Sequence, residues 1–220
     1  MMDTVGYQLL KFLIERLPPG KCAILFTMAK LKSSKDLLML LLYAADASGE
    51  TAAPIQGQTR LMKMVFLFNK ELKKHFKKDG AVEDAVFPEF EAYDYGPYSS
   101  QVYADLEFLV NMGFVEVDGS GAGEVSEEER SEFDYWTATG SADDDVDLTQ
   151  FGKTFTLSPR GRKFVVQKLE SWGISEKQLG LLKEFKTRCC EASLHNLLRY
   201  VYSRYPDMTK KSKIKNEVLR

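Results

Sequence analysis

The chain has 220 residues, of which 44% are hydrophobic and 28% are charged, and its formal net charge is −2 at pH 7. This composition can fill a globular core and excludes collagen-like, mucin-like and wholly disordered chains. Three cysteines without C-x-x-C spacing indicate a reducing compartment, and the longest apolar stretch, residues 37–45, is too short to span a bilayer, so we expect a cytoplasmic protein with no membrane partner.

Residues 1–34 are predicted to form a helical extension. Val5, Leu9, Leu13 and Leu17 recur at fourfold spacing, and Pro18 ends this pattern. The extension can pack on the rest of the chain or make a homodimer, and the sequence does not choose between the two.

The next two predicted helices belong to the core. Ser34 is expected to cap a helix over residues 35–47, which is apolar on nearly all sides. Thr59 is expected to cap a long helix with one apolar stripe and a lysine-rich opposite face. That face is predicted to hold Lys63, Lys70, Lys73, Lys74 and Lys77.

A strand, a turn and a third helix follow. Residues 87–95 alternate well enough for a short strand, and Gly96 with Pro97 is expected to form a turn. Ser99 or Ser100 then caps a helix that ends at Gly113.

Two strands, at residues 114–117 and 154–157, are predicted to pair as a hairpin with a very long tip. Residues 118–147 hold eleven acids against Arg130 alone, which gives this segment −10 and leaves +8 on the rest of the chain. Its glycines and serines predict a flexible tip. After the hairpin, Ser158 and Pro159 begin a helix, and Gly161 allows it to pack closely on the sheet.

Residues 173–220 are predicted to form two helices and a basic tail. Ser175 and Gln178 make a capping box for the first helix, and leucines at helical spacing mark the second. Tyr205 and Pro206 end it, and residues 207–220 form the tail.

This order of elements predicts a mainly α fold with a small β-hairpin (α+β). Residues 35–172 are expected to form a winged helix-turn-helix core, with residues 1–34 and 173–220 as helical additions.

Three motifs carry a resemblance to a known family. They are T-R-L-M-K-M-V-F-L at residues 59–67, Y-x-Y-G-P-Y-S at residues 93–99 and L-x-x-M-G-F-V at residues 109–115. Their order resembles the YwgA-like proteins and the related Panacea (SocA-like antitoxin) domain, and residues 200–212 are similar to the end of the YwgA-like group. The resemblance spans residues 35–215. It implies a winged-helix core and an antitoxin or adaptor role, and it implies no reaction.

One hypothesis is a transcription factor or antitoxin-like regulator that grips double-stranded DNA. Binding of DNA requires cationic side chains that face its phosphates and polar side chains that contact its bases. The candidate residues are Arg60, Lys63, Ser99, Ser100, Gln101, Arg160, Arg162, Lys163, Lys210, Lys211 and Lys213. Against this hypothesis, the third helix carries Asp105 and Glu107 without a basic residue, and the acidic tip would repel phosphates.

The alternative hypothesis is a protein-interaction adaptor that does not bind DNA. Its acidic tip would order on a basic protein partner such as a toxin. The candidate residues are Glu127, Glu128, Glu129, Phe133, Tyr135 and Trp136.

Enzymatic chemistry is not expected. His75 and His195 have no Cys or His at ligand spacing, and Cys189 with Cys190 is more typical of packed than of reactive thiols. The sequence lacks a phosphate-binding glycine loop and a nucleophile elbow. We therefore expect no catalytic residue, cofactor or metal.

Overall fold

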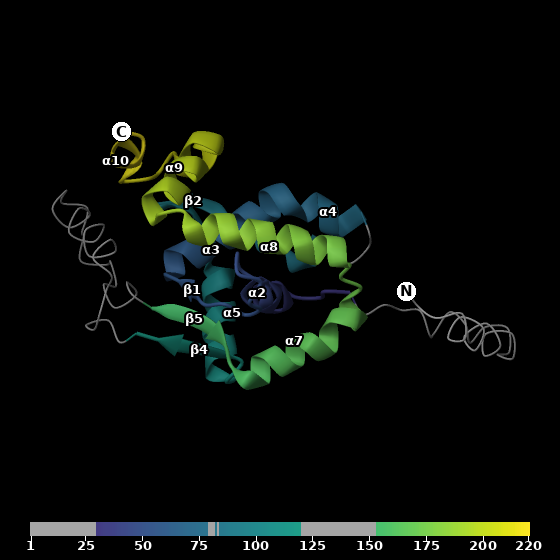
Figure 1. The fold of residues 1–220 in the computed structure, drawn as a ribbon. Coiled ribbons are helices and arrows are strands. Elements are labelled where there is room, and N and C mark those ends of the chain that lie inside the picture. Colours follow the sequence, from purple (N-terminus) through teal and green to yellow (C-terminus); the bar gives the residue numbers. More distant parts are fainter. Residues whose placement is uncertain (1–29, 79–81, 83, 120–152) are drawn as a thin grey trace, which may run out of the picture.

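The computed structural model describes residues 30–78, 82, 84–119 and 153–220 (Figure 1). It is mainly helical with a small antiparallel sheet, as predicted. Most of the predicted N-terminal extension and nearly all of the acidic tip lie outside the described residues.

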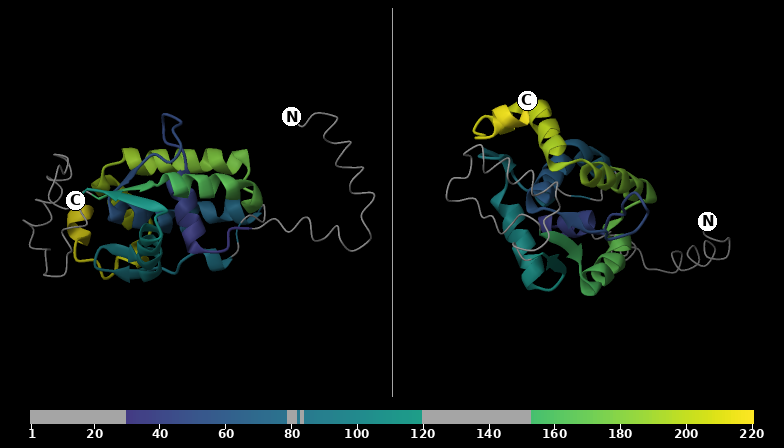
Figure 2. Two further views of the ribbon diagram at one scale, coloured as in Figure 1. Left: turned by 90° about the horizontal axis from the view of Figure 1, so that it is seen from below. Right: turned by 60° about the vertical axis from the view of Figure 1, so that its left-hand side comes forward.

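Helix α2 (Ser34–Tyr43) is the centre of the core, as its apolar sequence predicts. Figure 1 and the right-hand view of Figure 2 show α8 (Glu176–Glu191) and α7 (Pro159–Trp172) on opposite sides of it. Six successive side chains of α2, Leu37 to Leu42, are therefore buried. The predicted cap was wrong by one residue, because the hydroxyl of Ser33 accepts the hydrogen bond of Asp36 N.

The long helix predicted after Thr59 is one helical stretch in three parts: α3 (Gln58–Leu67), the π-helical turn η1 (Phe68–Leu72) and α4 (Lys73–Lys78). Its N-cap is Gly57 and no side chain caps it, so the prediction of a Thr59 cap was wrong. All residues from 61 to 68 are buried, because packed segments surround α3 rather than cover a single stripe.

A three-stranded sheet has the order β1-β5-β4 and is antiparallel throughout. The predicted hairpin is confirmed by β4 (Val115–Asp118) and β5 (Thr154–Leu157). The third strand, β1 (Ile55–Gln56), was not predicted, because two residues are too few to show an alternating pattern.

A second, two-stranded sheet contains β2 (Glu91–Tyr93) and β3 (Gly96–Tyr98), preceded by the short helix η2 (Asp84–Val86). The predicted turn at Gly96 and Pro97 was wrong, since the chain turns at residues 94–95 instead. Helix α5 (Ser100–Asn111) follows, and Gly113, at φ +69°, ends it as predicted.

Local signals for the C-terminal helices are confirmed. Ser158 caps α7 with Pro159 at its first position, and Ser175 and Gln178 form the capping box of α8. A Cβ on Gly161 would clash with the Phe114 carbonyl oxygen, so the predicted close packing of this glycine is confirmed.

The predicted basic tail is packed against the protein. After α9 (Leu194–Arg204) come η4 (Pro206–Thr209) and α10 (Lys215–Val218). Thr209, Ile214 and Val218 are buried, which anchors this segment.

Candidate functional site

Two of the predicted DNA contacts, Arg60 and Lys63, are used inside the protein. Arg60 Nη1 donates to the carbonyl oxygens of Cys189 and Ala192, where it caps the C-terminus of α8. Lys63 is 3% exposed, and its ammonium donates to Pro97 O at 2.9 Å. Burial lowers the pKa of Lys63 from 10.5 to about 7. Its predicted position on a solvent face was therefore wrong, and it has no access to a phosphate.

The polar residues at the start of α5 differ in exposure. Ser99 is buried and Ser100 is exposed. The Gln101 amide donates to Asp105 Oδ1 at 2.8 Å, which directs it toward its own helix.

The three basic residues at the start of α7 remain at the surface. Arg160 Nη1 donates to Met112 O at 2.8 Å, and its guanidinium lies 4.5 Å from the centre of the Phe114 ring. Arg162 Nε donates to Leu157 O at 3.2 Å. Within the described part of the chain, Lys163 has no ion-pair partner and is exposed.

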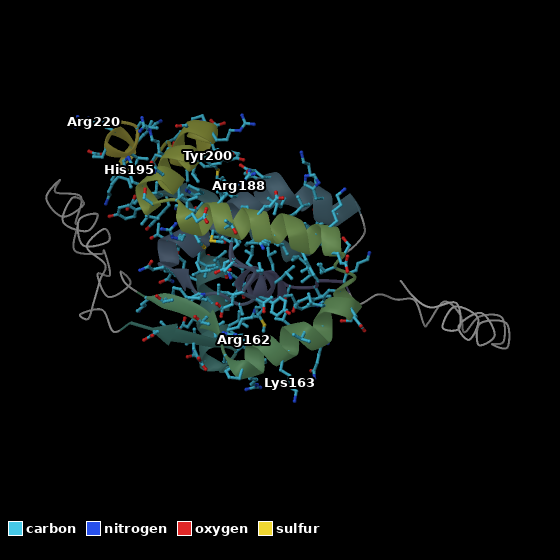
Figure 3. All side chains as sticks on the ribbon, viewed as in Figure 1. Arg162, Lys163, Arg188, His195, Tyr200 and Arg220 are labelled. Atoms are coloured by element: carbon cyan, nitrogen blue, oxygen red, sulfur yellow. The ribbon has the colours of Figure 1, made fainter. Side chains whose placement is uncertain are left out.

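The C-terminal lysines lie far from α7. Figure 3 shows Arg162 and Lys163 at one side of the molecule and Arg220, in the C-terminal segment, at the opposite side. Lys210 pairs with Asp207 at 2.7 Å, Lys213 pairs with Asp94 at 3.3 Å, and Lys211 is exposed. The predicted cations therefore do not form one continuous patch. The predicted partner-binding residues of the acidic tip lie outside the described residues.

The exposed face of α5 has one charged side chain of its own, Glu107, and the ammonium of Lys35 lies 5.1 Å from the centre of the Phe108 ring. Sequence reasoning counted Asp105 as an acid on this face, but it is 1% exposed and accepts hydrogen bonds from Ser34 and Gln101. Lys35 also contacts it at 2.6 Å. The surface of α5 instead presents two large apolar side chains, Phe108 at 46% and Met112 at 43% exposure.

Three tyrosine rings extend this surface from α5 onto the β2–β3 hairpin. The ring centres of Tyr93 and Tyr98 lie 5.0 Å apart, and those of Tyr98 and Tyr103 lie 5.4 Å apart. We call these three residues the tyrosine ladder. The sequence showed the tyrosines around Gly96 but could not show that three rings from β2, β3 and α5 pack against one another, at interplanar angles of 32° and 37°.

A separate polar cluster surrounds Glu71, which sequence reasoning missed. Its Oε1 accepts hydrogen bonds from the hydroxyls of Tyr200 at 2.8 Å and Tyr205 at 2.9 Å. Burial and the neighbouring carboxylate raise the pKa of both phenols. Both tyrosine hydroxyls donate to the same carboxylate oxygen, and the cluster thereby joins η1 to α9. This geometry indicates a structural role.

Other reactive groups are packed away. Burial raises the pKa of Cys189 to about 12, which keeps its sulfur a thiol near neutral pH. Among the described residues, no three His, Cys, Asp or Glu side chains gather as metal ligands would. None of the described helices has the length and apolar character needed to cross a membrane.

Comparison of the chain with models of protein families, with characterised proteins and with solved structures finds no match. The resemblance to YwgA-like and Panacea proteins rests on the sequence motifs alone.

Proposed function

We propose that this chain is a non-enzymatic regulator of the winged-helix type that acts by binding a protein partner, as an antitoxin-like adaptor does. The order α2, β1, α3, α5, β4, β5 and the sheet order β1-β5-β4 support a winged-helix arrangement. In a winged helix of this order, α5 would be the recognition helix, and β4 with β5 would be the wing.

The exposed face of α5 is the observation that carries the proposal. A helix that enters a DNA groove needs cations or polar side chains facing phosphates and bases. Helix α5 contains no lysine or arginine, and Phe108 and Met112 are nearly half exposed. Exposed apolar side chains at the centre of a surface are typical of a protein interface.

Co-expression with the product of the adjoining reading frame tests this proposal. The partner should co-purify with the unaltered chain and with Val166→Ser, and should be lost with Phe108→Ser. Val166 is a matched control because it is an apolar residue of α7 with 54% exposure. Equal retention by both variants, or no co-purification at all, contradicts the proposal.

DNA binding is the second candidate function, and the first turns of α7 favour it. Arg160, Arg162 and Lys163 are all exposed there. Fluorescence anisotropy with labelled duplex DNA at about 50 mM salt tests this candidate, since phosphate contacts are strongest at low salt. Binding that Lys163→Gln weakens and that salt abolishes would replace the adaptor proposal with a DNA-binding regulator. The homodimer, the cytoplasmic location and the role of the acidic tip stay predictions.

A further inference from the structure

The hairpin register places the tyrosine ladder on one face with a carboxylate. Glu91 lies directly opposite Tyr98, and Tyr93 lies opposite Gly96. Because alternate residues of a strand share a face, Glu91, Tyr93 and Tyr98 project to the same side. Tyr93 is the most exposed ring of the ladder, at 49%, so part of its surface is open to a ligand.

The charge around the ladder is negative. Glu91 is exposed beside Tyr98, and Glu107 is exposed on α5, one helical turn after Tyr103. The elements β2, β3 and α5 contain no lysine or arginine. Three cations near these elements have other partners. Lys213 pairs with Asp94, Lys35 pairs with Asp105, and the buried ammonium of Lys63 donates to Pro97 O.

Contacts from α9 and the C-terminal segment hold the hairpin in place. The Tyr202 ring packs against Gly96, where an added Cβ would lie 2.9 Å from Cε2. Both Ser212 Oγ and Lys213 N donate to Asp94 O, at 3.1 and 3.0 Å. A surface fixed before binding loses less conformational entropy when a partner docks.

We infer that the tyrosine ladder with Glu91 and Glu107 is a docking site for an arginine-bearing segment of a basic protein partner. This inference deepens the proposed function and rests on it. A guanidinium is planar and stacks on an aromatic ring, and its N–H groups bind carboxylates in pairs. Nucleic-acid bases also stack on tyrosine, but these elements hold no cation to neutralise the phosphates.

A peptide titration with the full chain tests the inference. The probes are two fluorescein-labelled decapeptides, one of alternating arginine and glycine and one of alternating lysine and glycine. The acidic segment attracts both by charge, whereas stacking favours arginine. The unaltered chain should therefore prefer the arginine peptide, and Tyr93→Ser should weaken the binding of that peptide by about threefold to tenfold.

Val166→Ser is the control, because Val166 is 54% exposed and lies on α7, outside the ladder. It should keep the preference for arginine. Equal binding by Tyr93→Ser and Val166→Ser, or a preference for arginine that survives in Tyr93→Ser, overturns the inference. If the partner still depends on Phe108 in the co-expression experiment, only the ladder assignment fails. If the DNA-binding experiment replaces the adaptor proposal with a DNA-binding regulator, the proposed function and the ladder assignment fail together.

Discussion

Lys63 on α3 and Pro97 on β3 are joined by a hydrogen bond of 2.9 Å between a buried ammonium and a backbone carbonyl oxygen. These residues come from two of the three motifs that resemble the YwgA-like and Panacea proteins. The motifs thus meet in space, where the lysine fastens the hairpin that carries the tyrosine ladder to the helical core.

Lys63 should make stability depend on pH. Its pKa is about 7 in the folded protein and 10.5 when unperturbed, so between these values the unfolded state binds more protons. The free energy of unfolding should therefore rise with pH in this window, by up to about 1.4 kcal/mol per pH unit for one full proton. In Lys63→Met this contribution is absent, and urea unfolding followed by tryptophan fluorescence at pH 7, 8 and 9 should show a flatter dependence. Lys74→Met, at an exposed site of α4, should keep the original slope. Parallel slopes in both variants contradict the prediction.

Gly96→Ala should destabilise the hairpin through two effects. The residue has φ +83°, and a Cβ there would lie 2.9 Å from the Tyr202 ring. Gly113 has φ +69° but nothing within 4 Å of an added Cβ, so Gly113→Ala measures the backbone strain alone. We expect about 1 kcal/mol for Gly113→Ala and about 2–3 kcal/mol for Gly96→Ala in thermal or urea unfolding. Similar losses in the two variants would show that Tyr202 yields to the methyl group.

Elements determined by neighbours in sequence were predictable. The Ser158 and Ser175 caps and the end of α5 at Gly113 all depend on residues within a few positions of one another. The strands β4 and β5 were each predicted from their own short pattern, although they pair across a long intervening segment. The apolar character of residues 37–42 likewise indicated a central helix, because no side of it could face water.

The candidate site was less predictable because its character depends on contacts between distant segments. Lys63 lies in a lysine-rich pattern that predicts a solvent face, yet β3 covers it. The sequence pattern predicts Asp105 to be a surface acid, but Ser34 and Lys35, about 70 residues earlier, contact its carboxylate in the folded protein. Removing Asp105 from the surface is what leaves α5 with an apolar face.

Asp105→Asn should loosen the contact between α2 and α5. The carboxylate is buried with Lys35 as its cationic partner and two further hydrogen-bond donors. An amide keeps the volume but removes the charge and one acceptor, so we expect a loss of about 2–3 kcal/mol in the free energy of unfolding. Glu107→Gln, an exposed change two residues along the same helix, should cost less than about 0.5 kcal/mol. An equal effect of the two changes would mean that the Asp105 contacts contribute nothing.

Lys186 presents the opposite case to Lys63, since every ammonium hydrogen has an acceptor. Its Nζ donates to the carbonyl oxygens of Leu42, Ala44 and Ala53, at 2.9, 2.9 and 2.7 Å, and thereby joins α8 to the end of α2 and the segment before β1. The side chain is fully buried, and burial lowers its pKa from 10.5 to about 8.

Lys186→Met keeps most of the volume but leaves three buried carbonyls without this donor, so the free energy of unfolding should fall by about 2–4 kcal/mol. Lys183→Met, on the same helix but only partly buried, should change it by less than about 0.5 kcal/mol in urea unfolding. If Lys186→Met were as stable as Lys183→Met, the cost of burying the charge would equal the gain from its three hydrogen bonds, and Lys186 would contribute no net stability to the junction.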